Sequence, residues 1–188
     1  MILNAVRVQN FKCINDSTSF KVDEKVTYLV GKNESGKTTL LQAISKLNPI
    51  DPDAADFTIL EYPRSRMVAY QQRAESQPDG VLTTTWSLSQ EDVADLEEIL
   101  GPAAREISNV DISKGYSNDT VWELEVDEQA VVQHLIAANE LDREEQRAVA
   151  GAQTVQELYR RLSGLETRTD RVKGGEKLYQ QGGAKLYH

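Results

Sequence analysis

The N-terminal third of the chain has the hydrophobic pattern of three strands followed by a helix. Residues 2–10 alternate between apolar and polar side chains, which predicts a strand, and residues 17–22 predict a second strand that returns antiparallel to it. Residues 26–30 are almost all apolar, as in a central strand that is covered on both faces. An amphipathic helix is expected to begin inside the following loop and to end at about Leu47.

The middle of the chain predicts two strands and a helix. Residues 67–73 suggest a strand, and residues 81–88, which are rich in β-branched and aromatic side chains, predict another. Ser89 is expected to cap the helix that follows, because the acidic residues directly after it suit the first turn of a helix. The pair Gly101-Pro102 is expected to end this helix.

The C-terminal part predicts a hairpin and then helices. Residues 107–113 and 120–126 form two expected strands joined by a short polar loop, and a helix is expected to open at Asp127 or Glu128. Residues 143–165 suggest one long, highly charged helix. Its apolar side chains are sparse, a pattern that suits an arm or an interface helix.

Composition limits the class of protein. The 188 residues contain no apolar run long enough to span a membrane and no start that resembles a signal peptide. The single cysteine, Cys13, excludes an internal disulfide and a cysteine metal cluster, so we expect a cytoplasmic protein without a membrane partner. Residues 67–188 hold twelve Lys/Arg and twenty-two Asp/Glu, whereas residues 1–66 are nearly balanced. The acidic part is a poor nonspecific surface for DNA.

Residues 31–38 carry the most informative motif. They read Gly-Lys-Asn-Glu-Ser-Gly-Lys-Thr, a full match to the phosphate-binding pattern G-x-x-x-x-G-K-[ST] between a predicted strand and a predicted helix. In such a loop, backbone N–H groups and the helix N-terminus face phosphate oxygens. Lys37 is then expected to contact the β- and γ-phosphates, and the Thr38 hydroxyl to ligate Mg²⁺. Thr39 is a weaker candidate for an α-phosphate contact.

Hydrolysis needs an acidic residue that the sequence does not clearly provide. The nearest candidates are Asp95-Leu-Glu-Glu and Glu123-Leu-Glu-Val-Asp, and neither follows an apolar run. Both patterns fit solvated surfaces better than a catalytic acid. Two explanations stay open: the chain is part of a longer protein, or it is a smaller phosphate-loop fold that takes its acid from elsewhere.

The N-terminal pattern resembles the start of an ABC-type ATPase head, as in the SMC, RecF and OLD proteins. The resemblance rests on Asn10-Phe-Lys followed by the loop Gly-x-Asn-x-x-Gly-Lys-Thr, and Glu61-Tyr-Pro-Arg after the helix is most similar to OLD-family ATPases. It implies that Asn10 and Lys12 lie near the base or the phosphates, and that Asn33 faces the γ-phosphate. With the loop, the candidate nucleotide-binding residues are Asn10, Lys12, Gly31, Lys32, Asn33, Glu34, Ser35, Gly36, Lys37, Thr38 and Thr39, with Lys37 as the catalytic residue and Thr38 as the metal ligand.

The expected fold is therefore α/β: an incomplete N-terminal lobe of an ABC-like P-loop NTPase with a mixed or antiparallel β subdomain. Residues 1–126 are expected to form this lobe, 127–168 a helical arm or insertion, and 169–188 a disordered tail. The resemblance implies ATP and Mg²⁺ as ligands and a head-to-head homodimer through nucleotide. It also implies a DNA or nuclease partner in DNA repair, nuclease control or antiphage defence, with hydrolysis in the full-length dimer and little turnover by this chain alone.

Two other functions stay open at this point. A small phosphate-loop kinase would need lid arginines, for which Arg160, Arg161 and Arg168 are weak candidates, and a GTPase would need an Asn-Lys-x-Asp guanine reader, which is absent. A non-hydrolysing interaction module that holds ATP as a structural ligand is the third hypothesis.

Overall fold

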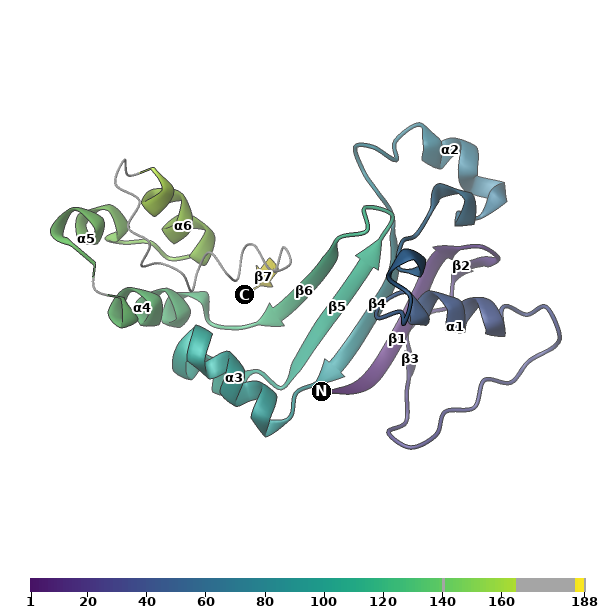
Figure 1. The fold of residues 1–188 in the computed structure, drawn as a ribbon, viewed down its shortest axis with the longest axis horizontal. Helices are drawn as coiled ribbons and strands as arrows, with labels where there is room; N and C mark the ends of the chain where they lie inside the picture. The colour runs from purple at the N-terminus through teal and green to yellow at the C-terminus, as the bar shows by residue number, and fades with distance from the viewer. Residues whose placement is uncertain (140, 165–184, 188) are drawn as a thin grey trace. The chain divides into compact units, whose positions relative to one another are not determined.

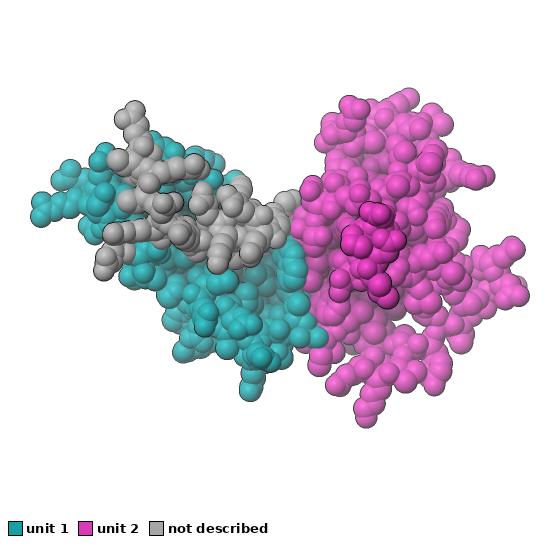
Figure 2. All heavy atoms as spheres, viewed as in Figure 1, with its two compact units in different colours: residues 1, 88–110, 122–188 teal, residues 2–87, 111–121 magenta. Residues whose placement is uncertain are grey.

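The structure is a computed structural model that describes residues 1–139, 141–164 and 185–187. These residues divide into two compact units, which Figure 2 colours separately. Unit 2 comprises residues 2–87 and 111–121 and contains the glycine loop. Unit 1 comprises Met1, residues 88–110 and the described residues from 122 onward.

The strands form a mixed sheet in the order β2-β1-β4-β5-β6-β7, and β3 also pairs with β1. β2, β3 and β4 are antiparallel to β1, and β7 is parallel to β6 (Figure 1). The strands are β1 Ile2–Phe11, β2 Ile14–Asp16, β3 Phe20–Lys21, β4 Gly80–Ser87, β5 Asn109–Gly115, β6 Thr120–Glu125 and β7 Lys185–Tyr187. The expected mixed α/β fold with an antiparallel sheet is thus confirmed at this level.

The core of unit 2 lies between β1 and helix α1, Lys37–Ser45. Pairing of β1 with β4 shifts register between Leu3 and Ala5, and beyond this irregularity Val6 and Val8 are buried. Leu40 and Ala43 of α1 belong to the same buried cluster, together with Phe11, Phe57, Val81 and Leu82. The helix that follows the glycine loop is therefore fixed to the sheet through its apolar face.

The predicted strand over residues 26–30 is wrong. Residues 26–30 form no strand, and no strand of the described residues pairs with them. Tyr28 is 83% exposed and Val30 is 89% exposed. The apolar run has the composition of a buried strand, but a strand also needs neighbours that accept its backbone hydrogen bonds and cover its faces.

Residues 67–73 also differ from the predicted strand, because Met67–Gln71 form helix α2. Its Tyr70 ring stacks on the Tyr62 ring with centroids 4.1 Å apart, and the Tyr116 ring lies 5.4 Å from Tyr70. This tyrosine cluster (Tyr62, Tyr70 and Tyr116) fixes α2 against the rest of unit 2. The packing decides the local structure where strand propensity alone did not.

Asp79 binds to the tyrosine cluster through Tyr62 and makes the stability of unit 2 depend on pH in the acid range. Its carboxylate accepts two hydrogen bonds from Arg73, each 2.8 Å, and one from the Tyr62 hydroxyl. The Arg73 guanidinium, followed by the Tyr62 hydroxyl, lowers the pKa of Asp79 against the opposing effect of burial.

The ionised Asp79 carboxylate therefore contributes to the free energy of unfolding. This contribution is present above the unfolded pKa and is lost as the pH falls through the lower, folded pKa. We expect Asp79→Asn to flatten the fall in stability as the pH drops below about 4, the ordinary pKa of an aspartate, measured by urea unfolding at several pH values. Equal slopes for the two proteins would contradict this.

Unit 1 contains the remaining helices. Ser89 caps α3, Gln90–Leu100, by accepting from the Asp92 N–H, and Gly101 ends it, both as predicted. Asp127 caps α4, Glu128–Ala138, by accepting from two backbone N–H groups. The remaining helices of this unit are α5 Arg143–Val149, α6 Val155–Ser163 and the 3₁₀ helix Gly101–Glu106, and further 3₁₀ helices in unit 2 are Pro52–Ala54, Ile59–Glu61 and Arg64–Arg66.

The single helix predicted over 143–165 is two helices, α5 and α6. The helical structure is interrupted between them, where Gly151 has a left-handed φ of 78° and the Thr154 side chain caps α6 by accepting from the Glu157 N–H. Val149, Val155 and Leu158 are buried, so this segment packs instead of standing free. The predicted domain boundaries at 126 and 168 stay a prediction.

The expected tail, 169–188, lies outside the described residues except for β7. Among the described residues, no helix has both the length and the apolar composition needed to cross a membrane.

Candidate functional site

The glycine loop, residues 31–36, connects the segment 26–30 to α1 and contains two residues with a left-handed φ. Glu34 has a φ of 64° and Gly36 a φ of 91°, and Gly36 is the N-cap of α1. A Cβ atom added at Gly31 would lie 2.8 Å from Ser35 Oγ. Gly36 is therefore needed for its conformation, whereas a side chain at position 31 would have to displace the Ser35 hydroxyl.

The Lys37 side chain folds back over this loop. Its Nζ donates hydrogen bonds to the carbonyl oxygens of Gly31, at 2.8 Å, and of Lys32, at 2.6 Å. Ser35 Oγ lies 3.5 Å away. The ammonium group thus lies among the backbone atoms of the loop, where an anion bound by the loop would meet it.

The N-terminus of α1 is suited to an anion. The first N–H groups of a helix have no partner within the helix and carry its positive dipole end. The first turn of α1 contains no acidic side chain that would compete for them, and Thr38 is exposed. These features fit a phosphate group, and Thr38 fits one ligand position of Mg²⁺. Among the described residues, no group of three His, Cys, Asp or Glu side chains is placed to hold a metal ion.

The turn at residues 10–13 packs against the start of α1. Cys13 Sγ donates to Thr39 Oγ1 at 3.5 Å, and a Cβ atom at Gly36 would lie 3.3 Å from the same sulfur. Lys12 Nζ donates to Gln42 Oε1 at 2.9 Å, one turn along α1 from Thr38. The structure thus brings Lys12, from the far end of β1, to the helix of the glycine loop.

Asn10 belongs to this turn, but its side chain contacts other segments. Its Nδ2 donates to the Gly80 carbonyl, and its Oδ1 accepts from Arg66 at 2.7 Å. Asn10 and Lys12 have left-handed φ values of 52° and 51°. Such conformations are costly for residues other than glycine and persist only where surrounding contacts hold them.

Sequence reasoning missed the residues that hold this turn. The backbone carbonyl of Glu61 accepts a hydrogen bond from the Lys12 backbone N–H. The Glu61 carboxylate lies 3.6 Å from Lys12 Nζ and 3.2 Å from Lys46 Nζ. The segment Glu61-Tyr-Pro-Arg was singled out for its resemblance to OLD-family ATPases, and that was the available signal for Glu61. No signal in the sequence indicated Gln42 or Arg66.

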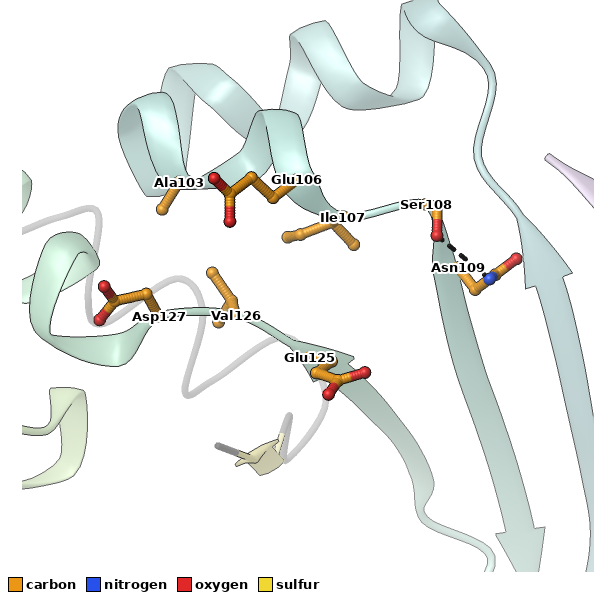
Figure 3. A pocket seen from close by; sticks show the side chains of 8 residues that line it. All are labelled: Ala103, Glu106, Ile107, Ser108, Asn109, Glu125, Val126 and Asp127. Carbon is orange, nitrogen blue, oxygen red and sulfur yellow. Dashed lines mark hydrogen bonds between the residues drawn. The ribbon is translucent and has the colours of Figure 1, made fainter.

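The other candidates lie away from the loop or have ordinary roles. Glu125 and Asp127 line a pocket of about 460 Å³ in unit 1 (Figure 3). Glu106 comes from its opposite wall, so three carboxylates line one cavity and would repel a triphosphate. Of the proposed lid arginines, Arg161 is held by Glu157 and the Ala150 carbonyl, and Arg168 lies outside the described residues.

A glycine loop at the N-terminus of a helix that packs on a mixed sheet defines an α/β protein with a candidate anion site. A comparison with protein families narrows this class to one family. The family described as AAA ATPase domain matches residues 1–146, and the chain belongs to this family. No curated protein matches the chain. Family membership indicates nucleotide binding and ATPase activity, and AAA ATPase domains generally use ATP and Mg²⁺.

Proposed function

We propose that the chain binds ATP with Mg²⁺ at the glycine loop and the first residues of α1, together residues 31–38, and that this binding is its primary activity. The observation that carries the proposal is the position of Lys37 Nζ, which bonds to the Gly31 and Lys32 carbonyls beside an acid-free helix N-terminus. A triphosphate would offer stronger, charge-assisted acceptors to the same ammonium group. Binding then exchanges the two carbonyl contacts for β- and γ-phosphate oxygens.

The other site residues have distinct roles in this proposal. Backbone N–H groups of Asn33 through Thr39 surround the phosphates, and the Thr38 hydroxyl ligates Mg²⁺, which neutralises phosphate charge when bound. Lys12 provides a second cation near α1, held at present by Gln42 and Glu61. Asn10 acts through the backbone of the turn and not through its side chain, because the side chain is committed to Arg66 and Gly80.

Hydrolysis is proposed for the full-length protein as a head-to-head dimer of the OLD/RecF kind, in the cytoplasm. The exposed segment 26–30 supports the dimer, since its apolar side chains suit a strand that pairs with a neighbour from elsewhere. DNA repair, nuclease control or antiphage defence are the contexts that the resemblance favours.

Nucleotide binding is tested by two readouts on the unmodified chain. We expect ATP with Mg²⁺ at ~100 times its Kd to raise the unfolding free energy by ~2.7 kcal/mol, which raises Tm by roughly 5–10 °C. We also expect the same ligand to slow alkylation of Cys13 by N-ethylmaleimide several-fold. Cys13 is exposed and lies beside Gly36 and Thr39, so a filled loop shields and rigidifies it.

AMP is the matched control ligand, because it lacks the β- and γ-phosphates that Lys37 and the loop would hold. It should change Tm and the Cys13 rate far less than ATP at equal concentration. An ATP concentration series that changes neither Tm nor the Cys13 rate would sink the proposal. Since Cys13 is the single cysteine of the chain, the alkylation rate reports this site alone.

A further inference from the structure

The end of β5 and its connection to β6 carry three polar side chains at alternate positions, and each bonds to the backbone of another part of unit 2. Lys114 Nζ donates to the carbonyls of Ala55, at 2.9 Å, and Lys46, at 3.4 Å. Asn118 forms two hydrogen bonds with the backbone of Phe57. The segments that they hold lie next to the C-terminal end of α1, which Lys46 caps.

Tyr116, the middle residue of the three, reaches the turn beside the glycine loop. Its hydroxyl donates a 2.6 Å hydrogen bond to the Asn10 carbonyl, 106 residues away in the sequence. Burial raises the pKa of the Tyr116 hydroxyl above its ordinary value, so this group stays a donor throughout the neutral range. The ring also packs at 5.5 Å from Tyr62 and 6.2 Å from Phe57, so its position is well defined.

The connection is itself fixed to the sheet, so it can serve as a rigid support. The Tyr116 backbone N–H donates to the Asp79 carbonyl at 3.1 Å. A Cβ atom at Gly115 would lie 2.5 Å from that same oxygen, so only glycine allows this approach. The fixed connection therefore places the Tyr116 hydroxyl against Asn10, which has a left-handed φ.

We propose that Tyr116 is a positioning residue for the nucleotide site, an inference that rests on the proposed function. Its hydroxyl holds Asn10 at its left-handed φ, and the turn that follows then sets Lys12 against Gln42 and Cys13 against Gly36. Within the described part of the chain, Tyr116 donates hydrogen bonds to the Asn10 and Asp79 carbonyls and to no group of the loop or of α1. Its effect on the site passes through the turn.

Tyr116→Phe tests the proposal, because it removes the hydroxyl and keeps the ring. We expect the variant to speed Cys13 alkylation in the absence of nucleotide and to weaken ATP affinity by about five- to tenfold, the effect of one lost, partly buried hydrogen bond. In a Lys12→Ala background the same change should weaken ATP affinity much less, because the turn then has no cation to position. A purely structural role would lower Tm without this dependence on Lys12.

Tyr62→Phe is the matched control, since it removes a hydroxyl from the same tyrosine cluster. That hydroxyl bonds to Asp79 and not to the turn, so this variant should lose stability while the Cys13 rate and ATP affinity stay close to those of the unmodified chain. Unchanged Cys13 rates in Tyr116→Phe, or equal changes in the two variants, would overturn the proposal. If the unmodified chain binds no ATP, the proposed function fails, and the rates without nucleotide still decide whether Tyr116 fixes the turn.

Discussion

Lys37→Ala is expected to lower ATP affinity by ~100-fold or more. The ammonium group would donate charge-assisted hydrogen bonds to at least two phosphate oxygens, each worth about 1.5–3 kcal/mol, and alanine leaves those oxygens without a cation in the loop. In the free protein the same change removes two contacts to exposed loop carbonyls, so the fold should change little. Isothermal titration calorimetry with ATP and Mg²⁺ measures the affinity, and urea unfolding without nucleotide measures the stability.

Lys25→Ala is the control for charge. Lys25 is an exposed lysine of the same unit, six residues before Gly31, and its substitution changes the net charge equally. The ATP affinity of this variant should stay within about twofold of that of the unmodified chain, because solvent and salt screen an exposed charge that does not touch the phosphates. Similar losses in the two variants would mean that ATP responds to the overall charge and not to a built loop, and would contradict the assignment of Lys37.

Elements whose limits are set by local chemistry were predictable from the sequence. Ser89 caps α3 as expected, and the helix that was expected to open at Asp127 or Glu128 starts at Glu128 with Asp127 as its N-cap. The β-branched run of β4 forms a strand that pairs along β1. The loop motif is followed by a helix from Lys37, because Gly36 allows the left-handed N-cap that starts it. In these places the local preference and the packing agree.

The wrong predictions arise where distant residues decide the structure. The segment 26–30 has the composition of a central strand, but a strand forms only when neighbours pair with it, and composition does not reveal whether they are present. Helix α2 forms because the Tyr70 ring stacks on Tyr62, a contact that no local pattern indicates. By contrast, the break between α5 and α6 had a readable signal: Gly151, then Thr154 with Glu157 three residues later, the pattern of a helix end and a new N-cap.

The candidate site was predictable only in its contiguous part. Residues 31–39 follow from the motif, and the resemblance added Lys12, which the structure places beside Gln42. The supports of the turn, Glu61, Arg66 and Tyr116, come from other elements and act through backbone carbonyls or through side chains of the turn. Contacts to a backbone carbonyl place no demand on the sequence of the residue that is held, so a single sequence carries no trace of them.

Phe11→Ala is expected to destabilise unit 2 by about 3–5 kcal/mol, because it leaves a cavity where a large ring was enclosed. Phe11 is 0% exposed and meets Phe57 edge to face with centroids 5.4 Å apart, in the same buried cluster as Leu40 of α1. Phe11 also lies between Asn10 and Lys12 in the sequence, so its buried ring anchors the turn to the core, while the Tyr116 hydroxyl bonds to the Asn10 carbonyl. The loss should therefore appear both in urea unfolding and in faster Cys13 alkylation under native conditions.

Tyr28→Ala is the matched comparison for this large effect. It also removes an aromatic ring, yet Tyr28 is 83% exposed, and a side chain that is already in water leaves no cavity behind. The unfolding free energy of this variant should stay within about 0.5 kcal/mol of that of the unmodified chain. A large loss in Tyr28→Ala would show that the segment 26–30 is packed in solution, and would place the predicted strand back among the elements of the core. A small loss in Phe11→Ala would instead mean that the cluster under α1 does not anchor the turn on which the nucleotide site depends.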